Sequence, residues 1–292
     1  MKFATYRHAG NTVFGLVTGN CVCGLSCALP DVRDLRDLIE KAEGDVARYL
    51  AIRDVRADAP IALADVELLA PILRPSKFLG LGGNYREHRV ESEAARSTGD
   101  HQIWFNKQTS CVTGPNHPIL KPAGSDELDY EGELGVVIGK RCRNVKAADA
   151  AEFIFGFLVC NDISVRDWQA RSPTHTLGKS FDTHGPIGPW ITTADEVDIG
   201  DLSLRTFVNG SLRQKARTSD MIFSVGEMIE ELSSAFTLEP GDILATGTPS
   251  GVGKYMIPAG YLNIGDIVRV EIETLGFIEN TVTVDGSNPS TI

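Results

Sequence analysis

The stretch that most constrains the fold of this chain is residues 129–139, Asp-Tyr-Glu-Gly-Glu-Leu-Gly-Val-Val-Ile-Gly. Its β-branched run, bounded by glycines, predicts a strand, and residues two apart on a strand point to the same face. Glu131 and Glu133 should therefore converge, while Gly132 faces the other way and Gly135 leaves open space beside the acids. Two like charges beside an apolar strand are costly unless a positive group lies between them, and a divalent cation meets that need. The alternative is a solvated strand face, where Glu-x-Glu is common.

A second apolar segment supplies a third carboxylate. Residues 157–163 read Phe-Leu-Val-Cys-Asn-Asp-Ile, so Asp162 stands where an apolar strand ends. Three carboxylates without an obvious His or Cys partner form an all-oxygen ligand set, which suits Mg²⁺ or Mn²⁺ better than Zn²⁺. Because Mg²⁺ usually keeps several waters, such a site has open positions for a substrate.

Length and charge restrict the class of protein. The chain has 292 residues, of which 42% are hydrophobic, enough to bury a core in a small N-terminal domain (1–71) and a large catalytic domain (72–292). The formal net charge of −11 argues against a nucleic-acid partner, because phosphate contacts need clustered Lys and Arg. Residues 1–8 lack the apolar region of a signal peptide, and no apolar run approaches the ~20 residues that span a bilayer. We therefore expect a cytoplasmic protein without a membrane partner.

The six cysteines are expected to stay reduced, because the chain is long and shows no signal peptide. Cys21, Cys23 and Cys27 form the one cluster in the sequence. Their spacing lacks the paired Cys-x2-Cys of a structural zinc site, so we favour packing residues in a hairpin.

Several local patterns predict individual elements. Residues 12–17 and 21–25 should form a hairpin around Gly19-Asn20, and residues 31–56 should form two helices separated at Gly44. Asn209-Gly210 is a strong hairpin signal, and Ser224 with Glu227 forms the capping box of a helix. Residues 92–102 are polar and are expected to be a flexible connection.

The segment after the strand predicted at 77–81 carries a candidate general base. Its glycines do not complete a dinucleotide-binding fingerprint, because Tyr85 stands at the third glycine position. His88 and Glu91 are three residues apart, which places them side by side on a helical turn. A carboxylate beside an imidazole fixes its tautomer and raises its basicity, so the pair can activate water, and the glycines upstream make the segment a candidate lid. An ordinary surface ion pair is the alternative.

The sequence leaves more than one role possible for two lysines and one loop. Lys107 could meet an anionic substrate or be solvated. Lys179 lies among Gly, Pro and aromatic residues, and could balance the three carboxylates or hold a substrate carboxylate. Residues 246–254 do not form a phosphate-binding loop, because Thr248 replaces its first glycine, but the loop can offer N–H and hydroxyl groups to a carboxylate.

Five motifs in this order resemble the fumarylacetoacetate hydrolase family: Gly-Gly-Asn-Tyr-x-x-His-x-x-Glu (82–91), Asp-Tyr-Glu-Gly-Glu-Leu (129–134), Asn-Asp-x-Ser-x-Arg-Asp-x-Gln (161–169), Gly-Lys-Ser-Phe-Asp (178–182) and Pro-Gly-Asp…Thr-Gly-Thr-Pro-Ser-Gly-Val-Gly (240–253). The resemblance implies a β-rich α+β chain, in which a mixed β-sandwich roll follows a small α+β N-terminal domain, and a homodimer. It also implies roles for nine residues: Glu131, Glu133 and Asp162 as metal ligands, His88 and Glu91 as the water-activating pair, Lys179 as a catalytic group, and Arg166, Gln169 and Thr248 around the substrate.

The resemblance points to the three-carboxylate branch of that family and to a small keto-acid substrate. Our leading hypothesis is Mg²⁺-dependent hydrolysis of a C–C bond in a 2,4-dioxo acid, an acylpyruvate or fumarylpyruvate-like compound of aromatic catabolism, by water activated at His88 and Glu91. The nearest alternatives keep the metal site and change the reaction, to oxaloacetate decarboxylation or to a hydratase or isomerase. A non-catalytic binding protein is the least favoured reading, because a binder has no need of a water-activating pair.

Overall fold

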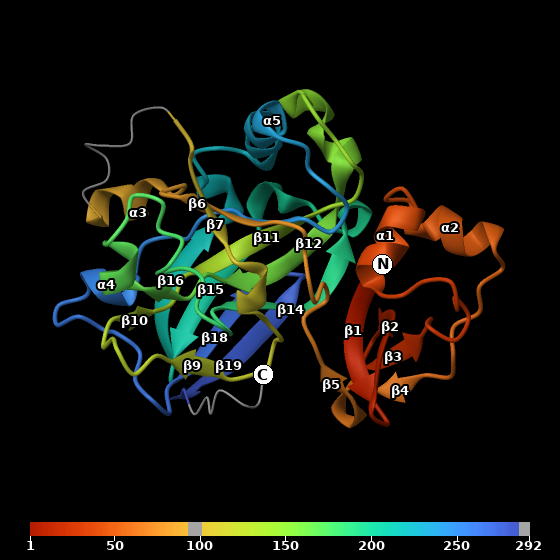
Figure 1. The fold of residues 1–292 in the computed structure, drawn as a ribbon, viewed down its shortest axis with the longest axis horizontal. Helices are drawn as coiled ribbons and strands as arrows, with labels where there is room; N and C mark the ends of the chain where they lie inside the picture. Colours follow the sequence, from red (N-terminus) through yellow and green to blue (C-terminus); the bar gives the residue numbers. More distant parts are fainter. Residues whose placement is uncertain (93–100, 286–292) are drawn as a thin grey trace.

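The computed structural model describes residues 1–92 and 101–285, so most of the connection expected at 92–102 lies outside the described residues. In Figure 1 the N-terminal part, in red and orange, stands beside the larger part that carries the site. Its elements are β1 (Lys2–His8), β2 (Asn11–Thr18), β3 (Cys21–Gly24), α1 (Leu35–Lys41), α2 (Val46–Ile52), β4 (Ile61–Ala62) and β5 (Glu67–Leu68). The predicted β2–β3 hairpin and the two helices separated at Gly44 are confirmed.

A mixed sheet runs through both parts of the molecule in the order β4-β3-β2-β1-β14-β12-β11-β17-β6-β7. Its strands beyond β5 are β6 (Phe78–Gly82), β7 (Ile103–Lys107), β11 (Gly132–Ile138), β12 (Ile154–Asn161), β14 (Gly185–Thr193) and β17 (Ile243–Ala245). β11, the strand predicted from the glutamate motif, lies between β12 and β17. Every residue of β11 is buried, so this strand lies in the interior of the protein.

A second sheet packs against the first. It has the order β16-β15-β18-β19-β9. Its strands are β9 (Ile119–Lys121), β15 (Ser203–Val208), β16 (Ser211–Arg217), β18 (Ile267–Ile272) and β19 (Gly276–Val284). The predicted turn at Asn209-Gly210 joins β15 to β16, with positive φ at both residues. Leu134 and Val136 of the first sheet pack with Leu204 and Val270 of the second in one apolar cluster, so the predicted β-rich sandwich is confirmed.

Short elements complete the fold. The remaining strands and helices are β8 (Val112–Thr113), β10 (Leu128–Asp129), β13 (Ser164–Val165), α3 (Arg86–Glu91), α4 (Arg166–Gln169) and α5 (Val225–Ala235). The 3₁₀ turns span Leu63–Asp65, Thr109–Cys111, Ala147–Phe153, Ala194–Glu196, Ile199–Asp201, Thr218–Asp220 and Gly253–Tyr255. The capping box predicted for Ser224 and Glu227 opens α5.

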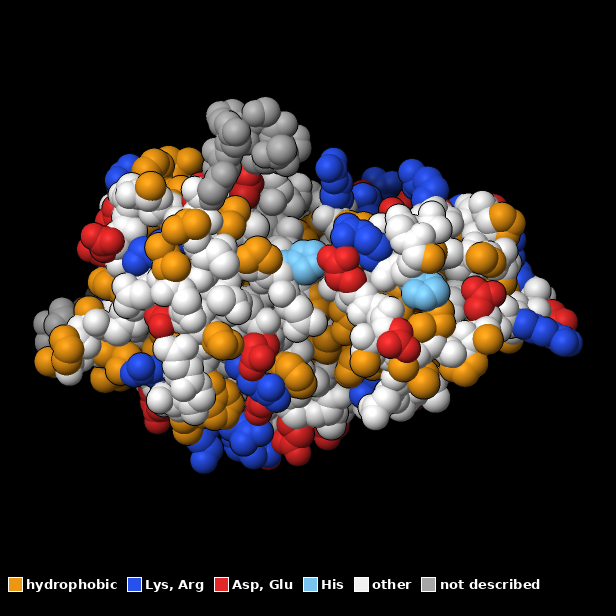
Figure 2. Space-filling view, turned by 90° about the horizontal axis from the view of Figure 1, so that it is seen from below, with side chains coloured by type: hydrophobic (Ala, Val, Ile, Leu, Met, Phe, Trp, Pro, Cys, Tyr) orange, Lys and Arg blue, Asp and Glu red, His pale blue; other side chains and the backbone are white. Residues whose placement is uncertain are grey.

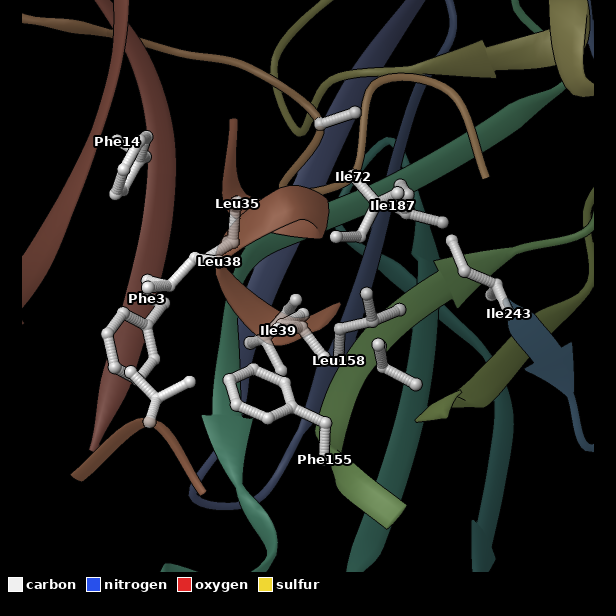
Figure 3. Packing of buried hydrophobic residues seen from close by; sticks show 14 of the residues in the cluster. Phe3, Phe14, Leu35, Leu38, Ile39, Ile72, Phe155, Leu158, Ile187 and Ile243 are labelled. Carbon is white, nitrogen blue, oxygen red and sulfur yellow. The ribbon is translucent and has the colours of Figure 1, made fainter. Parts of the chain in front are cut away.

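The other face of the first sheet is covered by α1. Asp34 caps this helix by accepting a hydrogen bond from the Asp37 N–H, and Leu35, Leu38 and Ile39 recur at helical spacing on one face. Figure 3 shows Ile39 beside Phe155 and Leu158 of β12, and Leu38 toward Phe3 of β1, all in one apolar cluster. The N-terminal part therefore shares an apolar core with the strands that lead to the site.

Gly135 does not leave open space beside the acids. A Cβ at this position would lie 2.4 Å from Leu158 Cδ1, so the leucine of β12 already fills the gap. Gly132 faces away from the acids, as predicted, and toward the second sheet, because a Cβ there would lie 2.2 Å from Thr206 Oγ1. The two glycines allow close packing on both faces of β11 and do not form a cavity.

The cysteines add no second metal site to the part of the chain that the structure describes. All six thiols are free, with Cys111, Cys142 and Cys160 buried. Within residues 1–92 and 101–285, the carboxylates of Glu131, Glu133 and Asp162 are the single cluster with metal-ligand geometry. Figure 2 shows acidic, basic and apolar side chains interspersed over one face of the molecule. No helix in the described part of the chain is both long enough and apolar enough to cross a bilayer.

Candidate metal centre and active site

The two central strands bring the three carboxylates together. Glu133 lies on β11 and Glu131 directly precedes that strand, while Asp162 directly follows β12, whose Asn161 pairs with Gly132. The Asp162 N–H donates to the Glu131 carbonyl oxygen at 2.8 Å, which fixes the third acid beside the first. One ligand oxygen from each carboxylate lies within 4.8 Å of the others, and the residues are 5%, 2% and 0% exposed.

Three buried cations hold two of these carboxylates. Arg166 Nη2 lies 2.7 Å from Glu131 Oε1, and Lys179 Nζ contacts both Glu131 Oε2 and Asp162 Oδ2. Lys107 is neither solvated nor open to a substrate: its buried amino group donates to Asp162 Oδ1 at 2.5 Å and to the carbonyl oxygens of Ile163 and Lys179. Burial alone would raise the pKa of Glu131, but Arg166 and Lys179 hold it well below its usual range.

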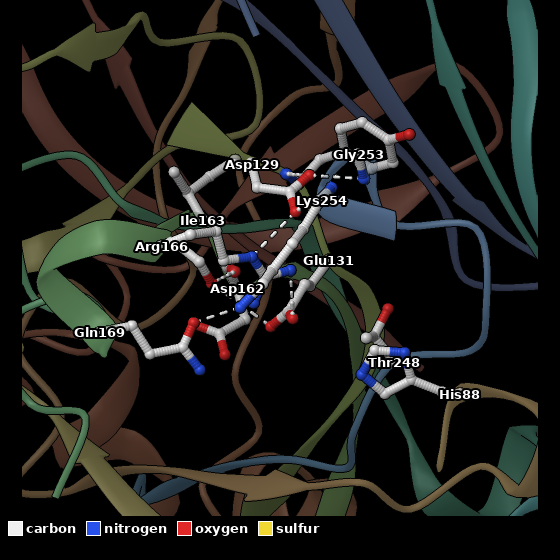
Figure 4. Close-up of polar contacts among 12 residues, drawn as sticks. His88, Asp129, Glu131, Asp162, Ile163, Arg166, Gln169, Thr248, Gly253 and Lys254 are labelled. Atoms are coloured by element: carbon white, nitrogen blue, oxygen red, sulfur yellow. Dashed lines mark hydrogen bonds and ion pairs between the residues drawn. The ribbon is translucent and has the colours of Figure 1, made fainter. Parts of the chain in front are cut away.

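Asp129, which the sequence analysis did not single out, organises the cluster from behind. Its carboxylate accepts hydrogen bonds from Arg166 Nε at 2.8 Å, from the Gly253 N–H at 2.7 Å and from the Lys254 N–H at 3.0 Å. Figure 4 shows this carboxylate between Arg166 and the 253–254 turn. Asp129 thereby joins the metal-site strand to the turn that borders the cavity. The only sequence signal for this role is its place in the glutamate motif.

Glu133 differs from its two neighbours. Its Oε2 accepts a hydrogen bond from the Gly247 N–H at 2.8 Å, and none of the ion pairs recorded for the described residues includes its carboxylate. Burial raises the pKa of Glu133 well above its usual range, and the negative charges of Asp162 and Glu131 raise it further. A buried carboxylate with two acidic neighbours and no cation of its own is the environment that a bound cation would relieve.

The charge balance fits a divalent ion. Four buried acids face three buried bases, namely Asp129, Glu131, Glu133 and Asp162 against Lys107, Arg166 and Lys179. With all four carboxylates ionised, as metal binding requires, one negative charge is in excess. The oxygen donors suit Mg²⁺ or Mn²⁺, and a divalent ion would change the excess to one positive charge, which an anionic substrate could balance.

The predicted His–Glu pair lies across the cavity from the acids. His88 and Glu91 are on α3, with Nδ1 and Oε1 2.7 Å apart. Glu91 also accepts from the Gly251 N–H, at 3.1 Å, and the His88 ring meets the Tyr255 ring edge-on with centroids 6.3 Å apart. A cavity of ≈ 340 Å³ borders His88 as well as the three acids. Figure 4 shows His88 apart from Glu131 and Asp162. The carboxylate of Glu91 fixes Nδ1 as the protonated nitrogen, which leaves Nε2 able to accept a proton.

The three residues expected around a substrate also border this cavity, but their polar groups are partly engaged. Thr248 Oγ1 donates to the Gly132 carbonyl oxygen at 2.9 Å and accepts from Gln214 Nε2 at 2.7 Å. Gln169 Oε1 accepts from Arg166 Nη1 at 3.0 Å, so its amide nitrogen remains for another acceptor. Thr248 thus braces the loop against β11 as well as bordering the cavity.

Sequence reasoning missed His175, Lys254 and Tyr255, which line the same cavity. His175 has a positive φ of 58° and its Nδ1 lies 3.2 Å from the Gln169 carbonyl oxygen. Lys254 and Tyr255 reach the cavity because the Asp129 carboxylate accepts hydrogen bonds from the backbone of their turn. These contacts join residues more than a hundred positions apart in the sequence. No local pattern in the sequence carries that information.

Comparison with known proteins identifies the group to which these residues belong. The sequence profile described as "Fumarylacetoacetate (FAA) hydrolase C-terminal" matches residues 77–283, which include all the residues of the site. The chain belongs to the fumarylacetoacetate hydrolase family. Members of this family are enzymes, so the site is that of a family whose members act as hydrolases, isomerases or tautomerases on keto acids.

Three relatives illustrate the range within the family. Oxaloacetate tautomerase fahd2, mitochondrial, of Xenopus laevis is 41% identical over 251 residues, which cover 85% of this chain and 78% of that protein. Oxaloacetate tautomerase YisK of Bacillus subtilis is 42% identical over 224 residues, 76% of this chain and 74% of that protein. The structure of maleylpyruvate hydrolase from Sphingobium sp. SYK-6, in complex with manganese and pyruvate, is 34% identical with a TM-score of 0.79, over 97% of this chain and 99% of that one.

Proposed function

We propose that this protein is a divalent-metal-dependent oxaloacetate tautomerase, which interconverts the enol and keto forms of the substrate. The observation that carries the proposal is the position of His88, paired with Glu91, across a cavity of ≈ 340 Å³ from three buried carboxylates. A cavity at the small end of the range for ligand sites suits a four-carbon oxo acid. The relatives named oxaloacetate tautomerase, at 41–42% identity, support this choice.

The chain offers a group for each requirement of the reaction. Glu131, Glu133 and Asp162 would hold Mg²⁺ or Mn²⁺, which supplies Lewis-acid stabilisation of negative charge on the substrate oxygens. Lys179 and Arg166 add positive charge on the same side of the cavity. Tautomerisation moves a proton between the enol oxygen and C3 of the substrate. His88 Nε2 would accept the proton from one position and return it to the other, while Glu91 holds the ring in the required tautomer.

Hydrolysis of a 2,4-dioxo acid, our leading hypothesis from the sequence, is the second candidate. The same His88 nitrogen could deprotonate a water for attack on the distal carbonyl carbon. The similarity to the maleylpyruvate hydrolase that holds manganese and pyruvate favours it. Oxaloacetate decarboxylation needs no attacking water, so it would leave the His88–Glu91 pair without that task.

The test is turnover by metal-stripped protein, with and without added Mg²⁺ or Mn²⁺. Enol-oxaloacetate is followed by the loss of its ultraviolet absorbance, and acylpyruvates of several chain lengths are followed by NMR of the products. Faster ketonisation of oxaloacetate only with metal, without CO₂ release, is the expected result. Cleavage of acylpyruvates to pyruvate and a carboxylic acid, with no effect on oxaloacetate, would replace the tautomerase by the hydrolase.

Other sequence expectations stay predictions and belong to this proposal. They are Mg²⁺ as the resident ion, the homodimer, the cytoplasmic location and the division of the chain at residue 71. Titration of the stripped protein with each metal addresses the first, and sedimentation of the purified chain addresses the second.

A further inference from the structure

Lys254 differs from the other cations that border the cavity. Arg166 and Lys179 are buried and each contacts a carboxylate of the metal site. Lys254 is exposed, and it forms no ion pair within residues 1–92 and 101–285. Its ammonium group lies 5.5 Å from the centroid of the neighbouring Tyr255 ring. The cavity thus has one positive charge that the described part of the protein does not neutralise.

The backbone of Lys254 is nevertheless held firmly. Asp129, itself 0% exposed, accepts the N–H groups of both Gly253 and Lys254, at 2.7 and 3.0 Å. Because the same carboxylate binds Arg166, the turn is fixed relative to the metal-site strand. In Figure 4 Lys254 lies beside Asp129 and Glu131. An unpaired cation on an anchored turn can bind a ligand at lower entropic cost than one on a free loop.

The turn that carries Lys254 also contacts His88, the candidate general base. Tyr255 follows Lys254 and meets the His88 ring edge-on. A group that binds Lys254 therefore lies in the part of the cavity that Glu131 and Tyr255 border. The four buried acids and three buried bases carry one excess negative charge, so a divalent ion together with Lys254 brings the site to two positive charges. A doubly charged anion would balance it.

We infer that Lys254 is a specificity-determining residue that binds the second carboxylate of a dicarboxylic oxo acid. This inference rests on the proposed function and narrows it to dianionic substrates. The interaction is a charge-assisted hydrogen bond from an ammonium group to a carboxylate. Since Lys254 is exposed, solvent weakens the interaction, and its loss should reduce affinity about ten-fold.

Binding of two ligands that cannot enolise to manganese-loaded protein tests the inference without tautomerisation. 3,3-Dimethyloxaloacetate keeps both carboxylates and cannot form an enol, because its C3 carries no hydrogen. Trimethylpyruvate has a methyl group in place of the second carboxylate. Calorimetry on Lys254→Met should show about ten-fold weaker binding of the first ligand and about equal binding of the second. Lys254→Arg should restore most of the affinity. Lys140→Met, which removes an exposed lysine beyond the opposite end of β11, should bind both ligands as the unmodified protein does.

Three results would overturn the inference. They are equal weakening of both ligands in Lys254→Met, unchanged binding of the dicarboxylate, and an unmodified protein that binds neither ligand or has no preference between them. Failure of the proposed function looks different. A protein that shows the Lys254-dependent preference but does not ketonise oxaloacetate is not a tautomerase, yet it selects dicarboxylates. If Lys254→Met ketonises oxaloacetate with the KM of the unmodified protein, the role of Lys254 is refuted and the tautomerase proposal stands.

Discussion

Replacement of Asp129 by Asn tests whether this carboxylate joins the metal-site strand to the 253–254 turn. The side chain is 0% exposed, and its two oxygens accept from four donors: Oδ1 from the N–H groups of Tyr130 and Gly253, and Oδ2 from the Lys254 N–H and Arg166 Nε. An asparagine keeps one oxygen. In either orientation its NH₂ group faces two N–H donors, which lose their acceptor.

The expected loss follows from these contacts. A buried donor without a partner costs about 1–3 kcal/mol, and removal of one partner from a buried ion pair costs about 3–5 kcal/mol. Arg166 keeps its contact with Glu131 at 2.7 Å, so the lower part of these ranges applies. We expect Asp129→Asn to lose about 4 kcal/mol of unfolding free energy, a large share of the about 5–15 kcal/mol that stabilises most domains.

Thermal unfolding followed by circular dichroism measures this loss. At the size of this chain, about 4 kcal/mol corresponds to a fall of about 10 °C in Tm. Asp126→Asn is the matched control, because Asp126 is fully exposed and lies 4.0 Å from Lys121; its Tm should not change. If Asp129→Asn lowered Tm no more than the control does, Asp129 would not anchor the turn, and the basis for the placement of Lys254 would fail with it.

Four other outcomes are expected. His88→Ala should reduce turnover by about 10²–10⁴-fold and leave Mn²⁺ binding intact by calorimetry, because His88 is not among the acids of the site; loss of both would mean that the His88–Glu91 pair is misassigned. Glu133→Gln should weaken Mn²⁺ binding, measured by electron paramagnetic resonance, by more than the about 10–100-fold typical of residues behind the ligands, and unchanged affinity would remove Glu133 from the site. A chelator should abolish turnover and added Mn²⁺ should restore it, whereas full activity after dialysis against the chelator would contradict a metal requirement. Burial lowers the pKa of His184 to about 3, below its ordinary value near 6.5, so between these two pH values the unfolded chain binds one more proton than the folded chain. The free energy of unfolding therefore falls as pH falls, by up to about 1.4 kcal/mol per pH unit. Urea unfolding from pH 7 to pH 5 should show a smaller change of this free energy with pH in His184→Gln, and an equal change in both proteins would exclude this role.

The parts of the site that sequence predicted are those fixed by short spacings. Alternation along a strand places Glu131 and Glu133 on one face, and three residues on a helical turn place His88 beside Glu91. Asp162 was placed only at the end of a strand. Its position beside Glu131 depends on the pairing of β11 with β12.

The parts that sequence did not predict depend on contacts between distant segments. Lys107 is buried against Asp162 at the end of β7, a strand that reaches the site through β6 and β17. Its sequence neighbours do not reveal this, so solvent exposure and substrate binding both remained open. Gly135 was expected to border open space, but Leu158 from the paired strand fills it. Local rules state which face a residue occupies, and packing decides what lies opposite.

The candidate active site combines residues held by a large sheet with residues on short surface segments, one of which is the six-residue helix α3. The acids lie on β11 or directly beside the ends of β11 and β12, in the middle of a wide sheet, whereas His88 lies on one short helix and Lys254 on one short turn. Exchange of those two surface segments between relatives would alter which molecule is accepted and what is done to it, without disturbing any strand. A protein built this way is well suited to evolve new reactions, and the same two segments are where a library for laboratory redesign should concentrate its variation.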